Sequence, residues 1–295
     1  SSFAVPPTIY AYDVRTKEKS VFHRQNLPVN SDDFVTEQVW YTSKDGTRVP
    51  MFVMYKRGTP RDGSAPAYLT GYGGFNESQR PTFTPRAVLW AEQGGVYALA
   101  NLRGGGEFGG AWHRAGILEQ KQHSYDDFIG AAEALIANKY TSPRHLAIAG
   151  VSNGGLLVMA TMVQRPELMH AVLCGYPLTD MLRFHKFFAG SFWIAEYGNP
   201  DDPKDFQWIY AYSPYQHVVA GTTYPAVMLV TGDADTRVAP LHARKMTAML
   251  QDRTGSNNPV VLRYHVSAGH AGGEPVSEQV KNEAEILGFL WWQTK

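Results

Sequence analysis

Residues 146–157 read LAIAGVSNGGLL, an apolar run that breaks at a Gly-x-Ser-x-Gly turn and then continues as a second apolar segment. The pattern predicts a strand, a strained turn that exposes the hydroxyl of Ser152, and a helix that begins directly behind it. Gly150 and Gly154 remove side chains that would collide across this turn, and Gly155 allows the helix to pack closely on the sheet. Because the motif is common by chance, an ordinary glycine-rich turn stays open until catalytic partners are found.

The overall composition excludes several classes of partner. The 295 residues carry 27 basic and 27 acidic side chains and are 44% hydrophobic. Balanced charge provides no basic field for nucleic acid, and the hydrophobic fraction is too high for a disordered chain. No apolar run approaches the ~20 residues that span a bilayer. We therefore expect one large core and neither nucleic acid nor a membrane as a partner.

The cysteine content and the first residues bear on the compartment. The single cysteine, Cys174, lies in an apolar stretch and cannot form an internal disulfide, so it is expected in the core. The chain begins Ser-Ser-Phe, without an initiator methionine and without a signal-like segment. A targeting signal can have been removed, so the compartment is unknown. The cytoplasm is favoured, and the periplasm or secretion stays open.

Strand-like and helix-like segments alternate along most of the chain. Two β-rich runs at 34–43 and 49–55 are joined by Asp45-Gly46, which predicts an antiparallel hairpin. The alternation beyond it predicts a mostly parallel central sheet with helices on both faces, interrupted by an aromatic excursion at 181–215. The expected strands are 67–70, 96–100, 146–151, 170–175, 225–231 and 260–266, and the expected helices are 85–93, 125–138 with Ser124 as N-cap, 240–252 and 277–292.

A serine nucleophile needs a general base, and the base needs an acid that fixes its tautomer. Asp235 and His270 each follow one of the last two expected strands. Loops after parallel strands meet at the same edge of a sheet, so these residues can converge with Ser152 in the chain order of an α/β-hydrolase. Asp233 competes for the role of the acid, and we prefer Asp235 because it lies deeper in its loop. The alternative is that the aspartates form turns.

Further motifs occur along the chain in a fixed order. They read GYGGF at 71–75, NLRGGGEFG at 101–109, GVSNGG at 150–155, DTRV at 235–238 and AGH at 268–270. Together they resemble the catalytic domain of the prolyl oligopeptidase family, over nearly the whole chain. The resemblance implies an α/β-hydrolase fold and a serine endopeptidase that cleaves short peptides on the carboxyl side of proline through an acyl-enzyme. It also implies the catalytic triad Ser152, Asp235 and His270.

An oxyanion hole must supply hydrogen bonds to charge that exists only in the transition state. The backbone N–H of Asn153 follows the nucleophile and is one expected donor. The resemblance assigns the second bond to the hydroxyl of Tyr72, whose neighbouring glycines allow its loop to approach a substrate closely. The alternative is that Tyr72 is an aromatic residue of the core.

The segment SFWIAEYG at 191–198 matches the family's specificity pocket. A proline ring is compact and apolar, so the resemblance implies stacking on Trp193 in a pocket that offers no charge to a basic side chain. It also implies that Arg237 hydrogen-bonds a substrate carbonyl, the alternative being a surface ion pair. Without the other motifs, core packing would account for the aromatic stretch. The other expected walls of the pocket are Phe75, Leu178, Tyr197 and Val238.

A competing motif is the run 104–109, which satisfies Gly-x-Gly-x-x-Gly after an expected strand. Asp126 or Asp127 follows roughly 20 residues later, as a dinucleotide site requires. However, Glu107 would repel a pyrophosphate, and no strong helix pattern begins at the third glycine. We therefore expect no cofactor. We also expect no metal, because no cluster of cysteine, histidine and carboxylate residues has metal-ligand spacing.

Other functions on the same scaffold stay open: a dipeptidyl or acylaminoacyl peptidase, a carboxylesterase, or a non-catalytic binding module. Members of the family carry a β-propeller ahead of the hydrolase, and this chain has no room for its seven blades. The resemblance implies that residues 1–30 are the end of the propeller and a linker, and that residues 31–295 are the catalytic domain. The implied partners are proline-containing oligopeptides and the missing N-terminal propeller portion.

Overall fold

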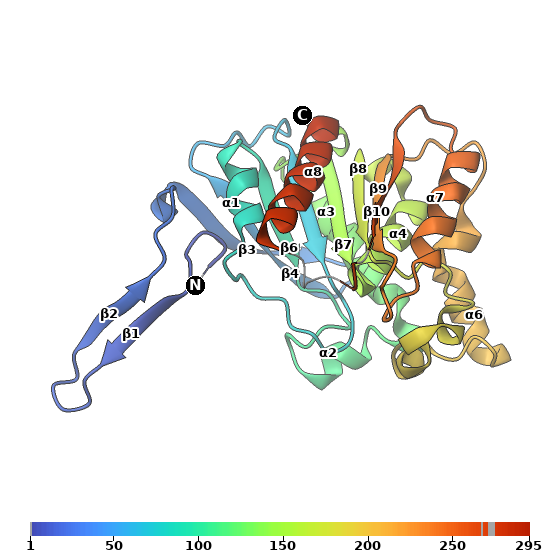
Figure 1. Ribbon diagram of the computed structural model, residues 1–295, viewed down its shortest axis with the longest axis horizontal. Helices are drawn as coiled ribbons and strands as arrows, with labels where there is room; N and C mark the ends of the chain where they lie inside the picture. The colour runs from blue at the N-terminus through green and yellow to red at the C-terminus, as the bar shows by residue number, and fades with distance from the viewer. Residues whose placement is uncertain (1, 267, 271–274) are drawn as a thin grey trace.

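The computed structural model describes residues 2–266, 268–270 and 275–295, and its centre is a mixed β-sheet (Figure 1). Its strands are β3 (Phe34–Thr42), β4 (Arg48–Lys56), β5 (Ala67–Gly71), β6 (Val96–Ala100), β7 (Leu146–Val151), β8 (Ala171–Gly175), β9 (Ala226–Gly232) and β10 (Val260–His265). In the described residues they pair in the order β10-β9-β8-β7-β5-β6-β4-β3. Strands β5 to β10 run parallel, and the hairpin β3–β4 adds an antiparallel edge.

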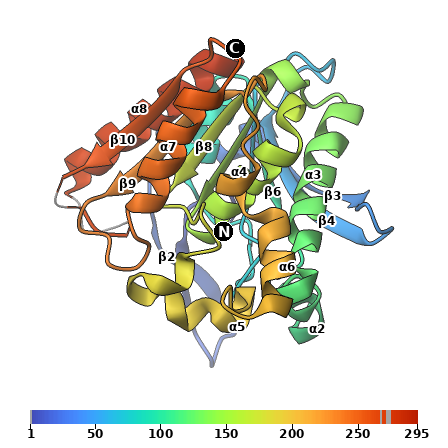
Figure 2. The ribbon, with the colours of Figure 1, turned by 90° about the vertical axis from the view of Figure 1, so that its right-hand side faces the viewer.

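Helices cover both faces of this sheet, as Figure 2 shows from the side. They are α1 (Pro85–Glu92), α2 (Gly110–Arg114), α3 (Gln122–Ala137), α4 (Asn153–Gln164), α5 (Ile194–Tyr197), α6 (Pro203–Tyr212), α7 (Leu241–Arg253) and α8 (Val276–Thr294). One core contains Trp90 of α1 and Leu290 of α8, and the other contains Leu135, Met159 and Leu250 of α3, α4 and α7. The central strands are mostly apolar because both of their faces are buried.

The aromatic excursion is built from short helical pieces between β8 and β9. Helix α6 begins at Pro203, whose missing N–H costs nothing at the first helical position. The side chain of Asp202 accepts a hydrogen bond from the backbone N–H of Lys204 and so caps the helix. In the part of the chain that the structure describes, the 3₁₀ turns are Ser31–Asp33, Leu118–Gln120, Pro143–His145, Pro166–Leu168, Phe184–Lys186, Phe188–Trp193 and Pro214–His217.

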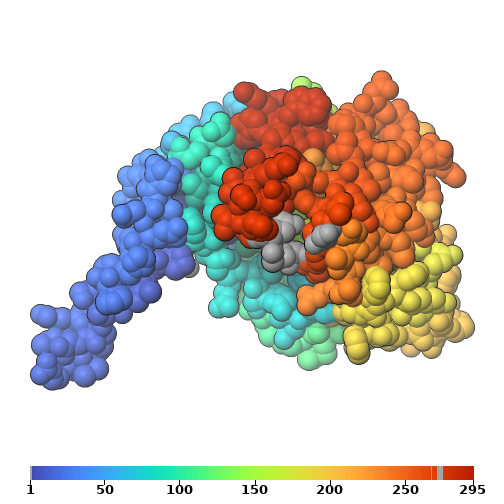
Figure 3. All heavy atoms as spheres, viewed as in Figure 1, coloured from blue at the N-terminus to red at the C-terminus, as the bar shows by residue number. Residues whose placement is uncertain are grey.

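The first residues form a hairpin that stands away from the rest of the molecule (Figures 1 and 3). Strands β1 (Thr8–Tyr12) and β2 (Lys19–Arg24) pair with each other in a separate two-stranded sheet. Phe3, in contrast, packs into the core beside the main sheet at 1% exposure and lies edge-on to the ring of Tyr97. The division into 1–30 and 31–295 therefore stays a prediction, with the first few residues packed against the second part.

The expected strands and helices are confirmed, with ends that differ by at most three residues. One local expectation was wrong: Ser124 is not the N-cap of α3, because the helix begins at Gln122. Ser124 is fully buried, and its hydroxyl donates to the backbone carbonyl of Arg103 over 2.7 Å. The hydroxyl of Ser124 therefore finds its hydrogen-bond partner in a distant loop and not at the start of its own helix. Within the described residues, no helix combines the length and apolar character that crossing a membrane requires.

Candidate active site

Ser152 occupies the turn between β7 and α4 with φ 61° and ψ −119°, a backbone conformation that is strained for a residue with a side chain. Two close approaches force this turn. A Cβ on Gly150 would lie 1.9 Å from the carbonyl oxygen of Gly154, and one on Gly155 would lie 2.8 Å from Pro177. The backbone N–H of Ser152 donates to the carbonyl of Gly175 over 2.9 Å, which ties the turn to the end of β8. The sequence interpretation of Gly150 and Gly155 is confirmed. That of Gly154 was wrong, because a Cβ there would lie nearest the carbonyl oxygen of Gly71, at 3.1 Å, and not across the turn.

Asp235 and His270 lie together in the loops after β9 and β10. Nδ1 of His270 and Oδ2 of Asp235 are 2.7 Å apart. The other carboxylate oxygen accepts the backbone N–H groups of Arg237 and Val238 over 2.9 and 2.8 Å. Asp235 is 1% exposed, whereas Asp233 is exposed. A buried carboxylate with one oxygen held by two N–H groups and the other on an imidazole can orient that imidazole.

The serine turn and the histidine loop are joined through two consecutive residues, the last of β8 and the one that follows it. Gly175 accepts the N–H of Ser152, and the ring of Tyr176 lies edge-on to the ring of His270 with centroids 5.6 Å apart. The N–H of Ala234 also donates to the carbonyl of Ala268 over 3.1 Å, which holds the loop of Asp235 against the loop of His270. The carboxyl edge of the sheet thus gathers the three loops that carry the predicted triad.

Tyr72 and Asn153 flank the serine. Asn153 is the first residue of α4, so its N–H has no acceptor within the helix. Its side chain donates to the carbonyl of Tyr72 over 2.6 Å and accepts the hydroxyl of Tyr197 over 2.8 Å. Burial raises the pKa of Tyr72, and a hydrogen bond with the side chain of Ser152 acts in the opposite direction. The phenol therefore stays protonated at neutral pH and can donate a hydrogen bond beside the serine.

A cavity of about 390 Å³ opens at Ser152. The side chains of Phe75 and Tyr197 meet edge-on inside its wall with ring centroids 5.6 Å apart. Val238 was expected in this wall but is not among the lining residues; it is buried, with its N–H on Asp235. The lining consists of Tyr72, Phe75, Glu77, Ser152, Leu178, Ala189, Trp193, Tyr197 and Arg237.

The expectation that the cavity offers no charge to a basic side chain was wrong, because Glu77 is among its lining residues. Glu77 lines the cavity together with Arg237, and both residues are exposed. Glu77 lies beside the cavity because Phe75 and Asn76 both have a φ of 57°, which turns the loop after β5 toward the mouth of the cavity. Asparagine adopts a positive φ more readily than most residues, but the sequence carries no such signal at Phe75. The cavity therefore combines aromatic walls with an acidic and a basic side chain that remain in contact with solvent.

Comparison with known proteins places this arrangement in a family. The model of the prolyl oligopeptidase family matches residues 81–295. The chain belongs to the prolyl oligopeptidase family. It is 43% identical to a prolyl endopeptidase of Elizabethkingia meningoseptica over 99% of its length, and 41% identical to prolyl oligopeptidase A of Galerina marginata over 98%. It spans only 42% and 40% of those two relatives.

Solved structures agree with this assignment. A prolyl endopeptidase structure superposes with a TM-score of 0.97 at 47% identity, covering all of this chain and 43% of that one. A post-proline cleaving enzyme from Rickettsia typhi superposes with a TM-score of 0.94 at 36% identity, again over all of this chain and 43% of its own. The central sheet, its order and its helical layers are thus those of the prolyl oligopeptidase family, and the expected α/β-hydrolase fold is confirmed.

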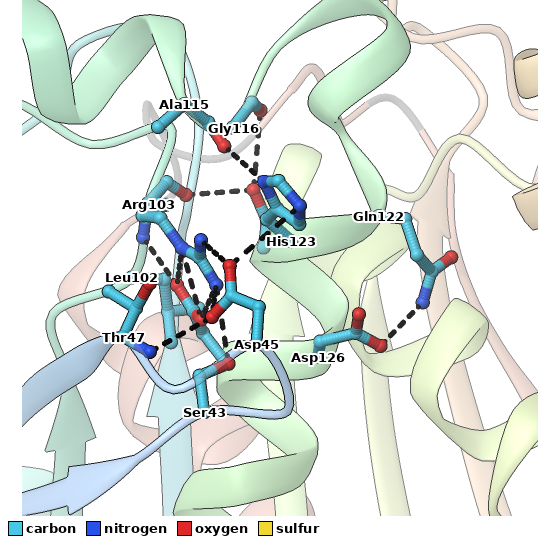
Figure 4. A network of polar contacts seen from close by, with 12 residues as sticks. Ser43, Asp45, Thr47, Leu102, Arg103, Ala115, Gly116, Gln122, His123 and Asp126 are labelled. Carbon is cyan, nitrogen blue, oxygen red and sulfur yellow. Dashed lines mark hydrogen bonds and ion pairs between the residues drawn. The ribbon is translucent and has the colours of Figure 1, made fainter.

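Arg103, the residue before the glycine-rich run that follows β6, lies in a network of polar contacts within the protein (Figure 4). Arg103 donates to Asp127 over 2.6 Å and to Asp45 over 2.5 Å. Hydrogen bonding to this guanidinium holds the pKa of Asp45 well below its usual range. Asp127 is fully buried against Arg103, so it cannot reach a ribose. Although the short helix α2 begins after Gly109, the chemistry of the loop argues against a dinucleotide.

Sequence reasoning missed several residues around the site. Glu77 and Ala189 line the cavity, and Lys121 and Glu196 form a buried ion pair behind it. Glu196 lies within the aromatic segment 191–198 and could have been found there as a charge in an apolar run. Lys121 has no such signal. Among the described residues, no group of three histidine, cysteine or carboxylate side chains could hold a metal ion.

The backbone beyond Leu178, a cavity residue, is anchored by a buried histidine. Nδ1 of His242 accepts the N–H groups of Thr179 and Asp180 over 3.4 and 3.2 Å. Burial is the main reason that the pKa of His242 falls from 6.5 to about 4, while the charges of Asp180 and Lys245 act in opposite directions. Both the hydrogen bonds and the burial therefore require the neutral imidazole.

This anchor predicts a pH dependence of stability. As the pH falls below 6.5, His242 becomes protonated in the unfolded chain, whereas in the folded protein it stays neutral until about pH 4. The free energy of unfolding should therefore fall as the pH drops through this window, by on the order of 3 kcal/mol from this group. Urea unfolding between pH 7 and 4.5 measures the slope. His242→Gln should flatten it and His23→Gln, at an exposed histidine, should not; equal slopes would contradict the assignment.

Proposed function

We propose that this chain is the catalytic part of a serine endopeptidase that hydrolyses short peptides on the carboxyl side of proline. The observation that carries the proposal is one cavity in which Ser152 lies beside an aromatic wall that includes Trp193. The pair of Asp235 and His270 in the adjoining loops supplies the general base that a serine nucleophile requires. Relatives named prolyl endopeptidase, 43% and 42% identical, support the same activity.

The reaction begins with attack by the hydroxyl oxygen of Ser152 on the scissile carbonyl carbon, while His270 takes the hydroxyl proton. Asp235 stabilises the imidazolium that forms. The carbonyl oxygen becomes an oxyanion between the N–H of Asn153 and the hydroxyl of Tyr72. His270 then gives its proton to the leaving amine, and the C–N bond breaks to leave an acyl-enzyme on Ser152. A water molecule, deprotonated by His270, attacks the ester and releases the acid.

The shape of the cavity favours proline before the scissile bond. A pyrrolidine ring is apolar and compact, and it can stack on Trp193 between Phe75 and Tyr197. Arg237 lines the same cavity, which supports its role as a donor to a carbonyl on the acyl side of the substrate. Because Glu77 and Arg237 are both exposed, their charges are solvated and select weakly against other residues.

A comparison of substrates tests the proposal. Matched chromogenic peptides that carry proline, alanine or arginine before the leaving group are compared with a simple ester, and a fluorophosphonate probe reports whether Ser152 reacts. Proline should give the highest kcat/KM. Preference for arginine, or for the ester, would favour another peptidase or a carboxylesterase on this scaffold. A lack of both labelling and turnover would favour a non-catalytic binding module.

Trp193→Ala is expected to lower kcat/KM for the proline peptide. The loss should correspond to about 1–3 kcal/mol of transition-state binding free energy, because stacking and burial are lost. Turnover of the simple ester, which has no ring to stack, should change far less. The two kcat/KM values, measured on the same preparation, check this prediction. An equal loss on peptide and ester would show that the substitution has disturbed the whole site rather than the proline contact.

We further propose that residues 1–30 close a β-propeller and that residues 31–295 are the catalytic domain. Two facts support this division: the relatives are more than twice as long as the chain, and the hairpin exposes Val14 and Phe22 at 79% and 76%. In the complete protein these side chains would be covered, so the amides of β2 should exchange hydrogen more slowly than in the 295-residue chain alone. Equal exchange rates would contradict the proposal.

A further inference from the structure

The loop after β5, which carries Tyr72, is held by two charged side chains from distant elements. Nζ of Lys121 donates to the carbonyl of Gly73 over 2.8 Å. On the other side of the loop, the N–H of Phe75 donates to Oε1 of Glu196 over 2.9 Å. The ammonium and the carboxylate are themselves 3.3 Å apart. One ion pair thus contacts the loop at two points.

This ion pair is buried, which is unusual for charged side chains. Lys121 is 1% exposed and Glu196 is 5% exposed. Burial lowers the pKa of Lys121, and the charge of Glu196 opposes that effect. The second carboxylate oxygen accepts Nε2 of His113 over 2.9 Å. Because a buried ion pair often stabilises a fold no better than apolar side chains of similar volume, this pair calls for a role beyond stability.

The loop needs such support because its backbone is strained. Gly73 and Phe75 have φ values of 63° and 57°, and the second is costly for a residue with a side chain. The loop also has little room to move. A Cβ on Gly74 would lie 2.6 Å from Nδ2 of Asn153 and 3.1 Å from Oε1 of Glu196. A small displacement would therefore move the hydroxyl of Tyr72 away from Ser152.

We propose that Lys121 and Glu196 are positioning residues, whose ion pair fixes the Tyr72 hydroxyl where the oxyanion forms. This inference rests on the proposed function of the site. Glu196 also lies in the chain between Trp193 and Tyr197, two walls of the cavity. The same carboxylate therefore fixes the relative position of the oxyanion donor and the proline pocket. Neither residue touches the substrate, and both act through the loop.

A double-mutant cycle in the complete protein tests this. Tyr72→Phe should lower kcat about 10²–10³-fold, because it removes one oxyanion donor. Lys121→Met keeps the length of the side chain but removes the ammonium, and it should lower kcat at least about tenfold when Tyr72 is present. In the Tyr72→Phe background the same change should cost less than about threefold, since the positioned group is gone. Glu196→Gln should show the same pattern.

Lys245→Met is the matched control. Lys245 also pairs with a buried carboxylate, that of Asp180, over 2.5 Å, but neither residue touches the loop of Tyr72. The fold-loss in kcat that Lys245→Met causes should be the same with and without Tyr72→Phe, so that the two losses multiply in the double variant. If the losses in kcat from Lys121→Met and Glu196→Gln also multiply with the loss from Tyr72→Phe, the inference is overturned.

A second measurement does not depend on turnover. A peptidyl-proline aldehyde forms a hemiacetal with the serine and places an oxygen in the oxyanion hole, whereas the matching alcohol binds without that bond. Lys121→Met should weaken the aldehyde at least about tenfold and the alcohol less than about threefold. Equal weakening of both ligands would overturn the inference.

Two further controls separate folding and specificity from positioning. If the single variants unfold, the double variant Lys121→Met/Glu196→Gln removes both buried charges at once, and it should still lose kcat only in the presence of Tyr72. If the wild type cleaves the ester but not proline peptides, the proposed specificity fails. The cycle is then measured on the ester, whose oxyanion needs the same donors.

Discussion

Replacing Ser152 with alanine is expected to abolish peptide cleavage, with a loss in kcat of about 10⁶-fold. The substitution removes the oxygen that attacks the carbonyl. It leaves the aromatic wall of the cavity in place, so a proline peptide should still bind. Stopped assays with a proline-chromogenic peptide measure the loss, and equilibrium binding of the same peptide measures what is retained.

Ser142→Ala is the matched control for this change. Ser142 lies before β7, at the opposite end of the strand from Ser152, so the same loss of a hydroxyl should leave turnover unchanged. Cleavage by the Ser152 variant at more than a trace of the wild-type rate would remove Ser152 from the mechanism. Retained activity accompanied by fluorophosphonate labelling would point to another nucleophile.

Asp235→Asn is expected to lower kcat by about 10⁴-fold, the size of the effect when a triad aspartate becomes an amide. The reason lies in the two carboxylate oxygens. Oδ1 accepts two backbone N–H groups, so the amide oxygen of asparagine must take that place and its NH₂ group must face Nδ1 of His270. The imidazole then carries its proton on Nε2 and cannot accept one from Ser152.

Asp233→Asn separates this explanation from a general effect of lost charge. Asp233 belongs to the same loop but is exposed, so the same substitution there should change kcat far less. Steady-state kinetics on the proline peptide compare the two variants. If Asp233→Asn were the more damaging change, the acid of the triad would be Asp233, and the contact between Asp235 and His270 would be structural.

Much of the fold could be predicted from the sequence because it depends on local pattern. Apolar runs bounded by glycine and proline indicated the strands of the main sheet, and their alternation with helical periods indicated the parallel order. The strained turn at Ser152 followed from Gly150, since a side chain there would collide with the carbonyl of Gly154 across the turn. The convergence of Asp235 and His270 followed from their places after neighbouring parallel strands.

Other features depended on contacts between residues far apart in the chain. The hydroxyl of Ser124 binds a loop carbonyl 21 residues away instead of capping its helix. Glu77 lines the cavity only because two positive φ values turn its loop, and Val238 donates its N–H to Asp235 instead of lining the pocket. A pattern of apolar residues indicates which face of an element is buried, but it carries no information on which polar atoms meet there.

The difference between what local sequence determines and what tertiary contacts decide is clearest at the loop of Tyr72. The sequence by itself determined that a glycine-flanked tyrosine follows a buried strand and that a serine turn follows the neighbouring one, because strand pairing and turn geometry depend on local residues. Only the tertiary structure decided what holds that tyrosine in place. Lys121 and Glu196 are 75 residues apart and come together because helix α3 and the aromatic excursion pack on the same side of the sheet. Their charges pair there because both side chains are buried away from solvent.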